Sequence, residues 1–119
     1  MGKHHDFGRI GEAKAVTFLE ARGYEVLERN WRFQRAEIDI IARIDETICI
    51  IEVKSRKNDS LRPIALAVDR KKIRLLLTAA DAYVTENDIS FEVRFDIITV
   101  LQKGTRFEIE HLQHAFYYF

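Results

Sequence analysis

The sequence predicts a single α/β domain in which helices flank a mixed β-sheet. Three observations predict it: two isoleucine-rich segments too short for helices, an amphipathic helical pattern on either side of them, and further strands after the second helix. A chain of 119 residues with 47% hydrophobic residues suits one compact unit covering residues 1–119.

The first predicted elements are a helix and a strand. Asp6 is a suitable N-cap for a helix from about Phe7 to Ala21, and Gly23 is placed to end it. A strand is expected from Tyr24 to Phe33, followed by a turn at Gln34-Arg35-Ala36. The stripe expected to face the core is marked by Ile10, Ala13, Val16-Thr17 and Leu19-Glu20.

The two isoleucine-rich strands, residues 38–44 and 47–54, are joined by the polar pair Asp45-Glu46. A short loop there places Asp39 opposite Glu52, and Glu37 opposite Lys54. Because side chains alternate along a strand, we expect these four charged residues on one face. The other face is expected to be wholly apolar, with Ile38, Ile40, Ala42 and Ile44 against Cys49, Ile51 and Val53.

The second half of the chain predicts a crossover helix and two strands. A polar loop is expected over Ser55–Pro63, and a helix from Leu66 or Val68 to Glu86, closed by Asn87-Asp88. Strands are expected at Ile89–Leu101 and Thr105–His111, turning at Lys103-Gly104. A right-handed crossover places the strand that contains Asp96 parallel to the strand before the helix.

Two carboxylates directly opposite each other on neighbouring strands repel, so Asp39 and Glu52 indicate a bound cation. Mg²⁺ favours one or two carboxylates together with water and substrate phosphate. The ammonium of Lys54 beside them suits a phosphate or an activated water. The alternative is an ion-pair cluster in which Lys54 and Arg56 neutralise the acids.

The spacing of Asp39, Glu52 and Lys54 resembles the D…(D/E)xK signature of restriction-endonuclease-like nucleases. Further segments occur in an order that is similar to the YraN-like family of small predicted endonucleases, from about Gly8 to Phe116. Ala36 departs from the family, which usually has Gly there, but this change removes no ligand. The segments are Gly11-Glu12-Ala13, Leu19–Tyr24, Arg29–Arg32, Glu37–Ile41, Ile51–Arg56, Ala67-Val68-Asp69, Lys71-Lys72, Ala79-Ala80 and Arg94–Ile98.

This resemblance implies a restriction-endonuclease-like αβββαβ core, close in fold to archaeal Holliday-junction resolvases. It implies a nuclease that uses Mg²⁺ or Mn²⁺, with Asp39, Glu52 and Lys54 as catalytic residues. Asp39 and Glu52 would bind the metal ion with Glu12 as an outer ligand, although a solvated helix glutamate is the alternative for Glu12. Glu37 faces Lys54 and is expected only to orient it.

The densest basic region consists of Arg56, Lys57, Arg62, Arg70, Lys71, Lys72 and Arg74. We expect part of it to position a nucleic-acid backbone, DNA being favoured, and the alternative is a solvated loop and helix face. The balance of 19 basic and 19 acidic residues argues against a broadly basic binder. A nucleic-acid-binding accessory protein with little or no catalysis, and a purely structural domain, remain alternatives. The substrate structure and the biological process stay open.

Other features favour simpler roles. Cys49 is expected to be a buried hydrophobe, and His111 and His114 are expected to pack or lie on the surface rather than bind metal. The aromatic tail from Phe116 to Phe119 is expected to pack on the sheet; its alternative is a self-association surface, and a homodimer is left open. The chain has no apolar segment of membrane-spanning length, so we expect no membrane association and a cytoplasmic protein.

Overall fold

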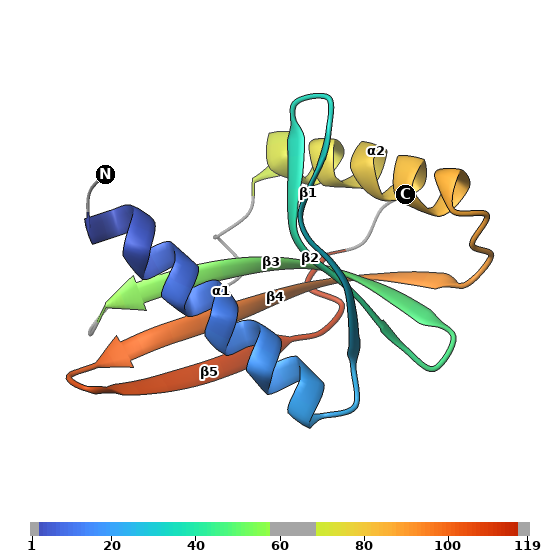
Figure 1. Ribbon diagram of the computed structural model, residues 1–119. Helices are drawn as coiled ribbons and strands as arrows, with labels where there is room; N and C mark the ends of the chain where they lie inside the picture. The colour runs from blue at the N-terminus through green and yellow to red at the C-terminus, as the bar shows by residue number, and fades with distance from the viewer. Residues whose placement is uncertain (1–2, 58–68, 117–119) are drawn as a thin grey trace.

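The computed structural model describes residues 3–57 and 69–116, with side chains from residue 7 onward. The predicted restriction-endonuclease-like order of helix, three strands, helix and strand is present around a central mixed sheet (Figure 1). The elements are α1 (Lys3–Ala21), β1 (Glu25–Phe33), β2 (Ala36–Ile44), β3 (Thr47–Lys57), α2 (Arg70–Glu86), β4 (Glu92–Lys103) and β5 (Arg106–Leu112).

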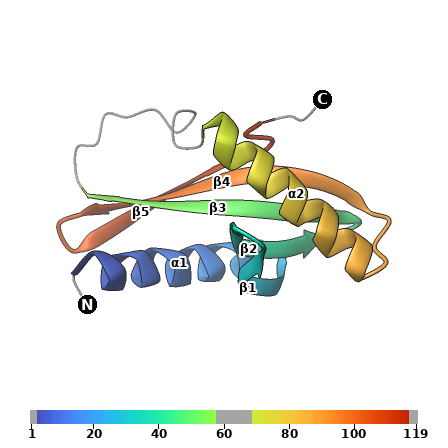
Figure 2. The same ribbon diagram turned by 90° about the horizontal axis from the view of Figure 1, so that it is seen from above.

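The sheet has five strands in sequential order, β1-β2-β3-β4-β5. β3 and β4 are parallel, as predicted for the strand of Asp96, and every other neighbouring pair is antiparallel. The helices cover opposite faces of the sheet (Figure 2), with α1 packed mainly against β3 and α2 against β2. The sheet therefore has a buried core on both sides.

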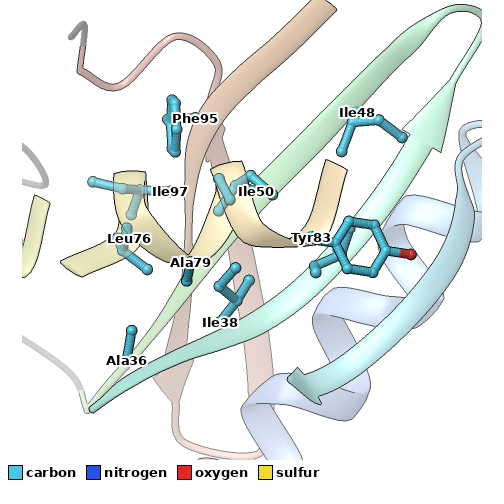
Figure 3. Packing of buried hydrophobic residues seen from close by; sticks show 11 residues of the cluster. Ala36, Ile38, Ile48, Ile50, Leu76, Ala79, Tyr83, Phe95 and Ile97 are labelled. Atoms are coloured by element: carbon cyan, nitrogen blue, oxygen red, sulfur yellow. The ribbon is translucent and has the colours of Figure 1, made fainter. Parts of the chain in front are cut away.

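Each helix covers its own core cluster. Beneath α2, Ile38, Ile50 and Phe95 pack against Leu76 and the neighbouring helix residues (Figure 3). Beneath α1, the buried residues are Ala15, Leu19, Tyr24, Ile40, Ala42, Cys49, Ile51, Ile98 and Val100. Central strands buried on both faces account for the nearly continuous isoleucine runs of the sequence.

The first helix differs from the prediction at its start and in its buried stripe. It begins at Lys3, so Asp6 lies inside the helix and is not its N-cap. Ile10 is 46% exposed, whereas Gly11, Ala15 and Leu19 form the buried stripe. Small residues at a spacing of four let the helix lie close to the sheet, and a search for large apolar side chains overlooks such a stripe. The predicted end holds, with Gly23 at a φ of 88°.

The third strand is longer than predicted. Ser55, Arg56 and Lys57, expected in a loop, continue β3 because β4 supplies backbone partners as far as Gln102. β4 begins at Glu92 rather than Ile89, and α2 begins at Arg70 behind the N-cap Asp69. The predicted loop residues 58–63 and the helix start at residues 66–68 lie outside the described residues.

The chain end packs back on the sheet as far as it is described. The ring of Phe116 lies 5.0 Å from that of Phe95, and the backbone N–H of Ala115 donates to the carbonyl of Phe95 at 2.7 Å. This confirms the expected packing for Phe116, and residues 117–119 lie outside the described part of the chain. Gly104, with a φ of 64°, forms the predicted turn between β4 and β5.

Candidate active site at the fork between two strands

β2 and β3 pair in the predicted register and then separate. Ile44 lies opposite Thr47, and the pairing continues to Ile40 opposite Ile51, where it ends. Beyond that point the β1–β2 hairpin turns away from β3 (Figure 1). At the start of this fork the carboxylate of Asp39 accepts a hydrogen bond from the backbone N–H of Val53 at 2.8 Å. A side chain thus takes the place of the next backbone partner.

The predicted division of faces is wrong at the fork. Ile38 belongs to the core beneath α2, whereas Ile40 and Ala42 belong to the core beneath α1. Strict alternation therefore fails at Asp39, because the strand twists away from its partner there. Glu37 and Asp39 line a cleft beside α1. Glu52, by contrast, contacts a side chain of α2, so the four charged residues do not share one face of a regular ladder.

Asp39 and Glu52 nevertheless come together across the fork. Burial raises the pKa of Asp39 to about 8, and a shared hydrogen bond with Glu52, together with repulsion by Glu52 and by Glu12, adds to the rise. The backbone N–H of Val53 acts in the opposite direction. A buried carboxyl group that lies against a second carboxyl group is a favourable place for a positive ion.

The cation that lies beside Glu52 in this structure is the side chain of Lys72. The ammonium Nζ of Lys72 lies 3.0 Å from Oε2 of Glu52, whose side chain is only 3% exposed. This short contact is the charge compensation that the described part of the chain provides for the buried oxygen. Although burial lowers it, attraction by Glu52 and a hydrogen bond with it, followed by attraction by Asp39 and Glu37, raise the pKa of Lys72 above its ordinary value. Lys72 therefore stays charged.

Glu12 lies in the same cleft as Asp39 but is held by two side chains of β1. Its Oε1 accepts from Nδ2 of Asn30 at 2.8 Å and lies 3.4 Å from Nε of Arg29. Asn30 has a φ of 52°, a left-handed conformation that asparagine adopts more readily than most residues. The cleft has a volume of about 810 Å³ and is lined by Phe7, Gly8, Arg9, Glu12, Arg29, Asn30, Arg32, Glu37, Asp39, Val53 and Ser55.

Sequence reasoning missed the arginines of this cleft as site residues. Arg32 lies 3.2 Å from Glu37 and is 76% exposed in its side chain, and Arg29 faces Glu12. Both lie in the segment Arg29–Arg32 that carries the family resemblance, which was the available signal. Glu37 is thus paired with Arg32, and its predicted role of orienting Lys54 has no contact among the described residues to support it.

The predicted basic residues are spread around the fork. Lys54 and Arg56 are half-buried on β3, and Lys71 is exposed in the first turn of α2. Nζ of Lys57 lies 5.4 Å from the ring centre of Phe7, next to the cleft. Of the predicted nucleic-acid-binding residues, only Lys72 touches an acid of the site in the described part of the chain.

A second buried acid, Asp96, was not predicted as part of any site. Its Oδ2 lies 2.8 Å from Nη2 of Arg94 and 2.7 Å from Nε2 of His111. Although burial raises it, the hydrogen bonds from His111 and Arg94 hold the pKa of Asp96 below its usual range. His111 also packs against the ring of Phe18, which confirms a packing role for this histidine.

The comparisons with known proteins give a family without an assigned activity. The model described as "Uncharacterised protein family UPF0102" matches residues 11–100. A UPF0102 protein of Flavobacterium psychrophilum is 45% identical over 119 residues, covering 100% of both chains. A UPF0102 protein of Parabacteroides distasonis is also 45% identical, over 98% of this chain and 97% of its own. Neither helix of the described residues has the length and apolar character needed to cross a membrane.

Proposed function

We propose that this chain, which belongs to the uncharacterised protein family UPF0102, is a metal-dependent nuclease that hydrolyses phosphodiester bonds in nucleic acid. One observation carries the proposal: the strand fork brings the carboxylates of Asp39 and Glu52 together, and it raises the pKa of Asp39 to about 8. Two carboxylates held close together at an opening in the sheet repel each other, and a cation bound between them would relieve this repulsion.

The donor set fits a hard divalent ion held mainly by water and substrate. Glu52 Oε2 is buried without a hydrogen bond among the described residues, and Asp39 is beside it. Within the described residues no three His, Cys, Asp or Glu side chains converge on one point, which argues against an all-protein cage. Mg²⁺ and Mn²⁺ suit such a site, with Asp39, Glu52 and the Val53 carbonyl as protein ligands and Glu12 assisting from the cleft. When bound, the ion would polarise the phosphoryl oxygen and lower the pKa of a bound water.

We assign the stabilisation of negative charge and the binding of phosphate to basic side chains near the acids. Lys54 follows Glu52 by two positions on β3 and so lies on the same side of that strand. We assign it to the stabilisation of developing negative charge or to holding the attacking water. Arg9, Arg29 and Arg32 line the cleft that contains Asp39, and they supply phosphate contacts that Arg56, Lys57 and Lys71 extend. DNA is the favoured substrate.

A second candidate is a nucleic-acid-binding accessory protein with little or no catalysis. The observation that favours it is that the chain neutralises its own acids: Lys72 pairs with Glu52, and Arg32 pairs with Glu37. Such a site has cations of the chain itself beside its acids and is compatible with nucleic-acid binding without turnover.

Two measurements on the full chain separate these candidates. Calorimetry with Mn²⁺ should show binding in the wild type and none in Asp39→Asn. A panel of junction, flap, nicked and single-stranded DNA, and of RNA, should then show Mn²⁺-dependent cleavage of at least one substrate. Salt-dependent binding of one substrate without cleavage of any would favour the accessory protein. The same metal response in wild type and Asp39→Asn would refute the metal site.

A further inference from the structure

The ion pair between Lys72 and Glu52 joins the first turn of α2 to the acid pair. Nζ of Lys72 and Oε2 of Glu52 are 3.0 Å apart; the lysine side chain is 40% exposed and the glutamate side chain 3% exposed. One partner is therefore fixed in the interior, while the other reaches in from the surface. Only the lysine has open space beside it into which the charged group can move.

The backbone of Lys72 is held by the N-terminal cap of α2, whereas its side chain is 40% exposed. The carboxylate of Asp69 caps the helix by accepting from the N–H of Lys72 at 2.8 Å, and the Asp69 carbonyl accepts from the N–H of Ile73 at 2.9 Å. The capped turn fixes the point from which the lysine side chain extends. The Cα of Lys72 is therefore fixed, and its ammonium can move by a change of side-chain rotamer.

The helix dipole does not explain a basic residue at this position. Cations near a helix N-terminus are unfavourable, yet the first turn of α2 holds Arg70, Lys71 and Lys72 and no acid. For Lys72 the compensation comes from the site, because Glu52, Asp39 and Glu37 all attract its ammonium. Lys72 is thus a shared counterion for three acids of the fork.

The contact also has the character of a replaceable one. In the described part of the chain the ammonium of Lys72, which comes from a half-exposed side chain, is the cation that lies against the buried Oε2 of Glu52. A divalent ion held by Asp39 and Glu52 would compete for this carboxylate and would repel the same ammonium. The two cations therefore exclude each other.

We propose that Lys72 is a tethered counterion that occupies the cation position beside Glu52 in the metal-free protein and leaves it when a divalent ion binds. This inference rests on the metal site of the proposed function. On this proposal Lys72 weakens the affinity of the site for metal and stabilises the metal-free fold. Metal binding is then coupled to the position of the Lys72 side chain in the first turn of α2. Lys71, exposed in the same turn, has the same charge and no such role.

Calorimetric titration of the full chain with Mn²⁺ tests this, with the melting temperature in EDTA as a second measurement. Lys72→Met should bind Mn²⁺ about tenfold more tightly than wild type, and Lys71→Met, the matched control, less than about twofold differently. Lys72→Met should melt below wild type in EDTA, and adding Glu52→Gln should recover most of that loss. Lys72→Arg, which keeps the charge and binds a carboxylate through a planar fork, should hold Mn²⁺ more weakly than wild type.

The possible results distinguish the counterion role of Lys72 from the metal site on which it depends. Unchanged or weaker Mn²⁺ binding by Lys72→Met, in a protein whose wild type binds Mn²⁺, overturns the counterion role and leaves the proposed function standing. If Lys72→Met does not fold, tighter binding by Lys72→Arg overturns the role instead. Mn²⁺ binding by neither the wild type nor Lys72→Met refutes the metal site itself. Binding by Lys72→Met alone supports the counterion role in its strongest form.

Discussion

The carboxylate of Asp39 accepts a hydrogen bond from the backbone N–H of Val53 at 2.8 Å, immediately beyond the last backbone pair of β2 and β3. One side chain therefore has two functions. It satisfies a backbone donor where the strands part, and it shares a hydrogen bond with the side chain of Glu52. The strand fork and the acid pair are the same structural feature.

The raised pKa of Asp39 makes the stability of the metal-free protein depend on pH. This pKa is about 8 in the folded protein and 3.8 in the unfolded chain, so only the folded state keeps the proton between these values. The stability that the protonated acid contributes is complete below about pH 4 and is lost as the pH rises through about 8. The free energy of unfolding of wild type should therefore fall relative to Asp39→Asn over this range, by a few kcal/mol.

Urea unfolding in EDTA at about pH 5 and about pH 9 measures this difference. Asp39→Ala is the control, because it lacks both the charge and the acceptor for Val53 and should be less stable than Asp39→Asn at both pH values. Parallel pH curves for wild type and Asp39→Asn would contradict the assignment.

Lys54→Ala should reduce Mn²⁺-dependent cleavage by about a hundredfold or more, because the variant lacks the ammonium that stabilises the charge developing on the phosphate. Mn²⁺ affinity should change little, since Lys54 is not a ligand. Lys54→Arg should not recover full activity, as a planar guanidinium does not replace a compact ammonium. Cleavage rates and Mn²⁺ titrations should be compared with those of Lys103→Ala, an exposed lysine paired with Glu108 at 3.1 Å. A loss of activity in Lys103→Ala equal to that in Lys54→Ala would count against a specific role.

Gly11→Ala should lower the free energy of unfolding by about 1–3 kcal/mol, because an added methyl group meets Oγ of Ser55 where α1 lies against β3. Gly8→Ala, one helical turn earlier, places its methyl group in open space and should be neutral or stabilising by up to about 1 kcal/mol. Chemical denaturation of both variants tests the close approach of helix and sheet. Equal stability of the two variants would show that α1 is not held there.

Asp96→Asn should cost about 3–5 kcal/mol, because it leaves the guanidinium of Arg94, 11% exposed, without its buried anion. The same change at the exposed Glu108, Glu108→Gln, should cost less than about 1 kcal/mol. The gain in melting temperature with Mn²⁺ should be the same in Asp96→Asn as in wild type, since Asp96 pairs with Arg94 and His111 and not with the fork. A lost Mn²⁺ response in a folded Asp96→Asn protein would show that the two acids act together.

The sequence by itself determined the fold class and most of the strand pairing. The isoleucine runs, the break at Asp45-Glu46 and the crossover helix were sufficient for the antiparallel register of β2 and β3 and for the parallel placement of β4. Their signal is local: the short polar turn at Asp45-Glu46 determines which residues of the two strands lie opposite each other, from Ile44 and Thr47 onward.

Only the tertiary structure decided how the site is assembled. Strand alternation predicted Asp39 and Glu52 on one face, but the twist at the fork places Ile38 beneath α2 and brings the two acids together through the opening. The partners Lys72 of Glu52 and Asn30 of Glu12 come from elements distant in sequence. Regular alternation of side chains holds for a strand that is paired with its neighbour, and β2 is no longer paired with β3 at Asp39. Which side chains meet at Asp39 therefore depends on three-dimensional packing and not on a repeat in the sequence.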